Sequence, residues 1–157
     1  TLALAVWGNH GPTIVHWEES PQAVTVNLRL GDVMPLLSSA TGRCFAAWLS
    51  KEAITPLLKE EIARAQKQGR GDVPATLAEA RALLDEVRQR GAARVVDTLL
   101  PGIVGFCAPV FDSDGHIVLG IVALGPSGTF DPSWGGTVDR PLRAAAHQLS
   151  SDLGFRA

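Results

Sequence analysis

Two long apolar segments joined by a hairpin turn constrain the fold of this chain most. Residues 103–111 and 116–124 are apolar almost throughout, and Asp112-Ser113-Asp114-Gly115 between them has the composition of a turn. Strands that are apolar on both sides need cover on both faces of their sheet. The pair therefore predicts a sheet with helices on one face and a ligand pocket or a partner subunit on the other.

Shorter segments elsewhere are also typical of β-strands. Residues 2–7 and 13–19 are separated by a Gly- and Pro-containing turn, and residues 23–30 alternate between apolar and polar side chains. Alternation with a period of two is typical of a strand with one buried face. With residues 93–96 and the long hairpin, the sequence predicts a six-stranded antiparallel sheet.

Four segments have the pattern of helices, and one of them follows Ser39. Another is residues 77–90, because Thr76 and Glu79 form a capping box at its start. Residues 51–65 and 138–153 have apolar side chains at the same helical spacing. Helices packed on an antiparallel sheet give an α/β (α+β) fold, and a chain of 157 residues fits one domain, 1–157.

The run Ser39-Ala40-Thr41-Gly42 predicts a helix that begins with small side chains. Ser38 or Ser39 can cap it, because a short hydroxyl group accepts from the free amides of the first turn. Those amides carry partial positive charge, so such a helix start can bind a carboxylate or phosphate. The alternative is a well-capped helix whose only special feature is close packing at Gly42.

Composition and charge restrict the function. The chain has 14 Lys and Arg against 16 Asp and Glu, a formal charge of −2. A surface that grips a nucleic-acid backbone is basic, so this chain alone is not expected to bind DNA. It shows no apolar run of the ~20 residues that a membrane span needs and no signal peptide. We expect a cytoplasmic protein without membrane contact. The missing initiator Met favours a domain taken from a longer chain.

The sequence contains no convincing catalytic or metal site. Cys44 and Cys107 are possible nucleophiles, but both lie in apolar segments without an evident base, and their spacing is unlike a metal site. We expect two free buried thiols. Asp112 and Asp114 flank a turn, where Asp favours hydrogen bonds to the backbone. No catalytic residue, metal or cofactor is therefore predicted.

Five short motifs occur along nearly the whole chain, at residues 35–42, 46–49, 91–92, 108–112 and 123–126. Their order and separation resemble the effector-binding domain of bacterial transcription factors of the isocitrate-lyase-regulator (IclR) type. The resemblance implies a GAF-like (profilin-like) fold, a small organic effector that is often a carboxylate, and assembly as a dimer or tetramer. It also implies DNA binding only through an N-terminal winged helix-turn-helix, which this chain does not contain.

The resemblance also implies the site, because in that family the effector lies between the curved sheet and the helix that follows the Ser/Ala/Gly motif. Ala40 and Thr41 would offer backbone amides at the start of this helix. The strand positions that correspond to the pocket are Val26, Met34, Val95, Ile103, Gly105, Val122 and Leu124.

The later of these positions are more apolar here than in family members that bind small polar acids, which tend to have Asp, Cys or Ser there. An apolar wall leaves the polar groups of a ligand without partners. We therefore expect a larger, partly apolar ligand, such as an aromatic or hydrophobic acid, whose carboxylate meets Ala40 and Thr41. The alternative is that Val122 and Leu124 complete the core and leave a small or empty pocket.

Other readings stay open at this point. Asp97 lies near the implied pocket and either lines it or bonds to a loop, and Trp7 or Trp17 lines either the pocket or a subunit contact. The chain can instead be a GAF-like sensor attached to another output, or a small stand-alone enzyme.

Overall fold

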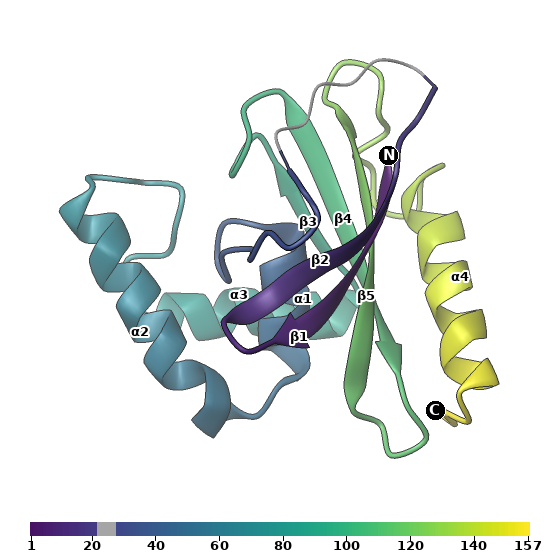
Figure 1. The fold of residues 1–157 in the computed structure, drawn as a ribbon. Helices are drawn as coiled ribbons and strands as arrows, with labels where there is room; N and C mark the ends of the chain where they lie inside the picture. Colours follow the sequence, from purple (N-terminus) through teal and green to yellow (C-terminus); the bar gives the residue numbers. More distant parts are fainter. Residues whose placement is uncertain (22–27) are drawn as a thin grey trace.

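The computed structural model describes residues 1–21 and 28–157. In these residues one antiparallel sheet has the strand order β2-β1-β5-β4-β3 (Figure 1). Its strands are β1 (Leu2–Gly8), β2 (Gly11–Glu18), β3 (Ala93–Val96), β4 (Ile103–Phe111) and β5 (Ile117–Pro126). Because β5 lies between β1 and β4, the N-terminal hairpin joins the same sheet as the long apolar hairpin.

The prediction of six strands is wrong for the described residues, which contain five. Most of the predicted strand 23–30 lies outside them, and residues 28–30 are not in a strand. Residues 31–34 run beside β2 and are joined to it by backbone hydrogen bonds and one isolated bridge. This stretch stays short because its ends do not continue a strand. Gly31 has a φ of 87°, and Pro35 has no N–H to donate.

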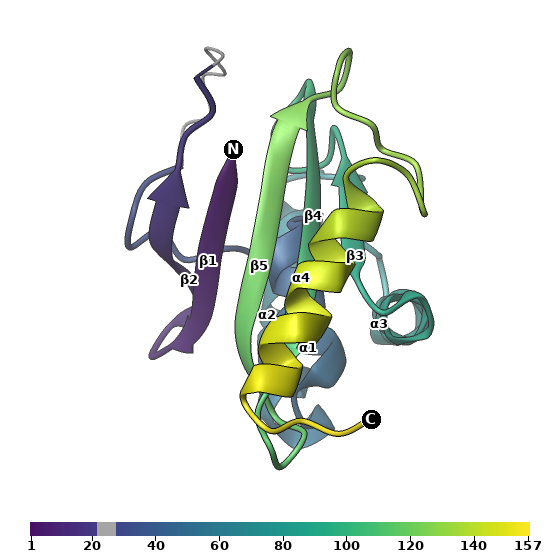
Figure 2. The same ribbon diagram turned by 90° about the vertical axis from the view of Figure 1, so that its right-hand side faces the viewer.

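Helices cover both faces of the sheet. They are α1 (Ala40–Trp48), α2 (Lys51–Lys67), α3 (Leu77–Arg90) and α4 (Asp139–Asp152). Figures 1 and 2 show α4 on one face, α1 and α3 on the other, and α2 farther from the sheet. No helix of the described residues is both long and apolar enough to cross a membrane.

The strand β4 contributes to two separate cores, which confirms that both of its faces are covered, but helices lie on both faces rather than on one as predicted (Figure 2). Phe106 and Val110 pack in a cluster with Leu142 and Ala146 of α4, whereas Cys107 packs in the larger cluster that contains α1. Alternate residues of a strand point to opposite faces, so a fully apolar strand is buried on both. The predicted α+β class is confirmed.

The helix starts follow their capping residues. Ser39 caps α1, and Ser50 caps α2 at its predicted start. At α3 the Thr76 hydroxyl oxygen accepts from Glu79 N at 3.1 Å, as the capping box predicts. Glu79 reaches back to Ala75 N at 3.0 Å rather than to the amide of the cap residue.

Candidate functional site

The start of α1 is built on a loop, residues 35–39, that folds tightly against the helix. Ser39 Oγ accepts from Gly42 N at 2.8 Å and donates to Pro35 O at 2.7 Å. A Cβ at position 42 would lie 1.9 Å from Pro35 O, so only glycine permits this approach. The close packing expected at Gly42 is confirmed, and it coexists with the free amides of the same helix start.

The first two amides of α1 have no partner within the described residues. Neither Ala40 N nor Thr41 N donates to a protein acceptor there, although both residues are 2–3% exposed. The first turn of α1 also has no acidic side chain. Free N–H groups at a helix start carry partial positive charge. This helix start is therefore a buried pair of donors without a counter-charge.

A pocket lies against these amides, and we call it the α1 pocket. Its cavity volume is about 20 Å³, room for about one water molecule, so a larger ligand has to displace side chains of the lining. Its lining has no charged side chain and consists of Ile14, Leu28, Met34, Ser39, Ala40, Thr41, Val95, Leu99, Leu100, Ile103, Gly105, Val122 and Leu124. The pocket thus combines an apolar wall with one electropositive end.

The structure brings the predicted site residues together. Eight of the nine line the α1 pocket: Met34, Ala40, Thr41, Val95, Ile103, Gly105, Val122 and Leu124. The ninth, Val26, lies outside the described residues. The structure therefore shows that these eight residues line one pocket, and their contact with a ligand stays a prediction.

Sequence reasoning missed five lining residues: Ile14, Leu28, Ser39, Leu99 and Leu100. Leu99 and Leu100 follow β3 in the loop that leads to β4. Two adjacent leucines in a turn are a signal that this loop covers apolar space, because exposed loops are usually polar.

The three residues with open roles do not line the α1 pocket. The Asp97 carboxylate accepts from Gly102 N at 2.6 Å, so it bonds to its own loop. Trp7 has its ring centroid 6.2 Å from that of Phe45, and Trp17 packs at the edge of the same core.

One wall of the pocket is joined to the beginning of the chain. Leu124 N donates to Thr1 O at 2.9 Å, next to the paired strands β1 and β5. The backbone of a pocket residue therefore holds Thr1, the residue that precedes β1, in place.

A carboxylate on α2 fixes the loop before α1. Glu61 Oε2 accepts from Leu36 N at 2.8 Å, and Glu61 Oε1 accepts from Leu37 N at 2.7 Å. From the other side, Arg43 Nε donates to Leu37 O at 2.7 Å. Hydrogen bonds to charged groups are stronger than neutral ones, so these contacts position the loop that carries the α1 pocket's donors.

Glu61→Gln is expected to lower the free energy of unfolding by about 1–3 kcal/mol, since glutamine has one carbonyl oxygen for two amides. Urea denaturation measures the change. Glu60→Gln is the matched control, because Glu60 forms an exposed ion pair with Arg64 at 3.0 Å and its loss should cost less than about 1 kcal/mol. Equal losses in the two variants would contradict a special role for Glu61.

The two cysteines are free and fully buried, as expected. Burial raises the pKa of the Cys44 thiol, and a hydrogen bond with Cys107 raises it further. A thiol held in its protonated form is a poor nucleophile. The surroundings of Cys44 therefore do not favour its use as a nucleophile.

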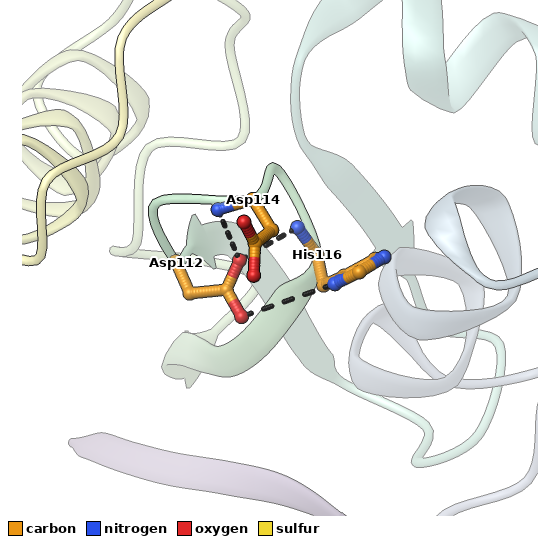
Figure 3. A group of neighbouring side chains, drawn as sticks. All are labelled: Asp112, Asp114 and His116. Atoms are coloured by element: carbon orange, nitrogen blue, oxygen red, sulfur yellow. Dashed lines mark hydrogen bonds and ion pairs between the residues drawn. The ribbon is translucent and has the colours of Figure 1, made fainter.

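Asp112, Asp114 and His116 form the one group of the described residues whose donor atoms lie close enough to hold a metal ion (Figure 3). Asp112 Oδ1 accepts from Asp114 N and from His116 N, both at 3.0 Å. His116 Nδ1 lies 4.0 Å from Asp112 Oδ2. These contacts close the turn between β4 and β5, which is the role predicted for Asp112.

Comparison with known proteins gives a consistent picture. Residues 1–151 match the family model described as bacterial transcriptional regulator IclR C-terminal. The HTH-type transcriptional regulator KdgR of Escherichia coli K12 is 24% identical over 156 residues, which cover 99% of this chain and 58% of KdgR. The crystal structure of Pseudomonas aeruginosa HmgR is 35% identical, with a TM-score of 0.87, over 99% of this chain and 60% of that one.

A second similar structure was solved with a ligand. It is a double mutant of the inducer-binding domain of the PobR transcription factor from Acinetobacter, in complex with 3-hydroxybenzoic acid. It is 18% identical, with a TM-score of 0.75, over 95% of this chain and 86% of that one. At this identity the likeness concerns the fold. The chain spans about 58% of E. coli KdgR and 60% of the HmgR chain.

Proposed function

Because the chain belongs to the family of IclR-type bacterial transcriptional regulators and matches their C-terminal part, we propose that residues 1–157 form one effector-binding domain. The observation that carries this proposal is the α1 pocket, whose apolar wall ends at the free amides of Ala40 and Thr41. The curated relatives are transcriptional regulators rather than enzymes, which favours binding over catalysis.

The proposed effector is an aromatic or other partly apolar acid. Its carboxylate accepts hydrogen bonds from Ala40 N and Thr41 N, and its hydrocarbon part contacts apolar side chains such as Val122 and Leu124. Small polar acids fit less well, because the described lining offers few further donors or acceptors. The 3-hydroxybenzoic acid bound to the PobR domain, which shares this fold, supports an aromatic acid.

The proposed regulation is a population shift in an assembled regulator. Effector binding favours one arrangement of a dimer or tetramer, and this arrangement changes how a separate N-terminal winged helix-turn-helix presents itself to DNA. The formal charge of −2 supports DNA contact through that other domain. The greater length of KdgR and HmgR supports such a second domain. The regulator acts in the cytoplasm, where its DNA lies.

Thr41→Pro tests the amide site. Proline lacks the N–H group but is compatible with the first turn of a helix. An aromatic acid at 100 times its Kd stabilises a protein by about 2.7 kcal/mol, and we expect this stabilisation to vanish in the variant. Thermal unfolding with 3-hydroxybenzoate and a panel of aromatic and aliphatic acids measures it.

Thr41→Val is the matched control, because it removes the hydroxyl group and keeps the amide. It should retain the stabilisation. Full stabilisation of Thr41→Pro would remove the anion site from the proposal, and a panel in which no acid stabilises the unmodified chain would contradict the function itself.

A further inference from the structure

A second cleft, which we call the arginine cleft, lies between α1, α3, β3 and the loop before α4. Its cavity volume is about 150 Å³. Arg43 of α1, Arg90 of α3 and Arg94 of β3 line it together with Glu86 and Trp134. None of the residues that line the α1 pocket lines this cleft.

The arginine cleft has an excess of positive charge. Three guanidinium groups face one carboxylate, that of Glu86, which lies 3.4 Å from Arg90 Nε. Within the described residues, neither Arg43 nor Arg94 has a carboxylate oxygen within 4 Å. Both side chains are half-buried, so their guanidinium groups lie in the cleft without a carboxylate partner and remain partly open to solvent.

Arg43, the first of these two groups, is half-buried. It donates to backbone oxygens only, from Nε to Leu37 O at 2.7 Å and from Nη1 to Arg94 O at 3.4 Å. Burial lowers the pKa of Arg43, although Asp72 and Glu86 act in the opposite direction. Its charge is therefore partly removed from water without an ion-pair partner.

Arg94 is held in place by other contacts. Its Nη1 donates to Pro132 O at 2.8 Å, and its guanidinium carbon lies 4.9 Å from the ring centroid of Trp134. The guanidinium carbon of Arg90 lies 4.8 Å from the same centroid. Stacking on an aromatic ring and bonding to a carbonyl restrict an arginine before a ligand arrives, which reduces the entropy lost on binding.

We propose that the arginine cleft is a second ligand site, which binds a small oxyanion, either a carboxylate or a phosphate. The planar guanidinium fork matches two oxygens of such a group. Arg94 and Arg43 bind the oxyanion directly, and Trp134 orients Arg94. The site does not depend on the proposed effector, because it shares no residue with the α1 pocket.

Titration calorimetry of the whole chain with inorganic phosphate, and separately with acetate, tests the site at constant ionic strength set with chloride. We expect at least one of the two anions to bind, and Arg94→Gln to weaken that binding at least tenfold. Arg94→Lys keeps the charge without the fork and should give an intermediate loss. Arg64→Gln, which makes the same charge change on α2, should change the affinity less than twofold.

The binding should persist in Thr41→Pro, which separates the arginine cleft from the α1 pocket. Three results would overturn the proposal. They are no binding of either anion to the unmodified chain, equal affinity in Arg94→Gln, or loss of binding in Thr41→Pro. If Arg94→Gln does not fold, the contrast between Arg94→Lys and Arg64→Gln decides the question.

Discussion

Gly42→Ala is expected to lower the free energy of unfolding by about 3 kcal/mol or more. The added Cβ would lie 1.9 Å from Pro35 O and 2.6 Å from Leu36 Cα. Both are backbone atoms, so no side-chain rotation relieves the clash, and the loop before α1 must move. Overpacking of a tight interior typically costs about 1–3 kcal/mol, and more where the backbone has to shift.

Urea denaturation measures this loss, and Gly71→Ala is its control. Position 71 has no heavy atom within 4 Å of an added Cβ and no positive φ. Its substitution should change the free energy of unfolding by no more than about 0.5 kcal/mol. Similar stabilities of the two variants would show that the loop does not rest on Gly42 as closely as the structure indicates.

Gly105→Leu is expected to abolish binding of an aromatic acid in the α1 pocket, if the proposed function is correct. An added Cβ at position 105 would lie 3.1 Å from Leu124 Cδ2, 3.4 Å from Val95 Cγ2 and 3.7 Å from Ala40 Cβ. These three residues are walls of the pocket. The further atoms of a leucine must enter the space between them, so the affinity should fall at least tenfold, or about 1.4 kcal/mol.

Titration calorimetry with the acid that best stabilises the unmodified chain measures the affinity, and circular dichroism verifies the fold. Gly105→Ala is the control, because its Cβ is tight only against the flexible end of Leu124 and lies at ordinary contact distances from Val95 and Ala40. It should retain binding within a few-fold. Unchanged affinity in Gly105→Leu would place the ligand elsewhere.

Sequence alone predicted the C-terminal half of the sheet well. The bounds of β3 and β4 agree with the predicted 93–96 and 103–111, because glycine and proline turns mark their ends. The helix starts were equally predictable, because a capping serine or threonine is a local sequence signal. The eight described site residues met in one pocket because the motif resemblance fixed their positions along the strands.

What the sequence did not reveal depends on contacts between distant residues. The bonds from Glu61 to the loop before α1 span 24 and 25 residues, and no local pattern distinguishes Glu61 from Glu60. Residues 31–34 form backbone hydrogen bonds to β2 without becoming a regular strand. The alternation of apolar and polar side chains along the sequence does not reveal this arrangement. The arginine cleft likewise joins α1, β3 and a loop that lie far apart along the chain.

The hydrogen bond from Leu124 N to Thr1 O joins one wall of the α1 pocket to the first residue of the domain, so under the proposed function a bound effector lies close to that residue. An effector that displaced the backbone at Leu124 would therefore also act on Thr1. Any segment that precedes Thr1 in a longer protein therefore starts one hydrogen bond away from Leu124, which lines the α1 pocket. Such an effect would not have to cross the whole fold, because Leu124 lies in β5 and Thr1 leads into β1, the strand paired with β5.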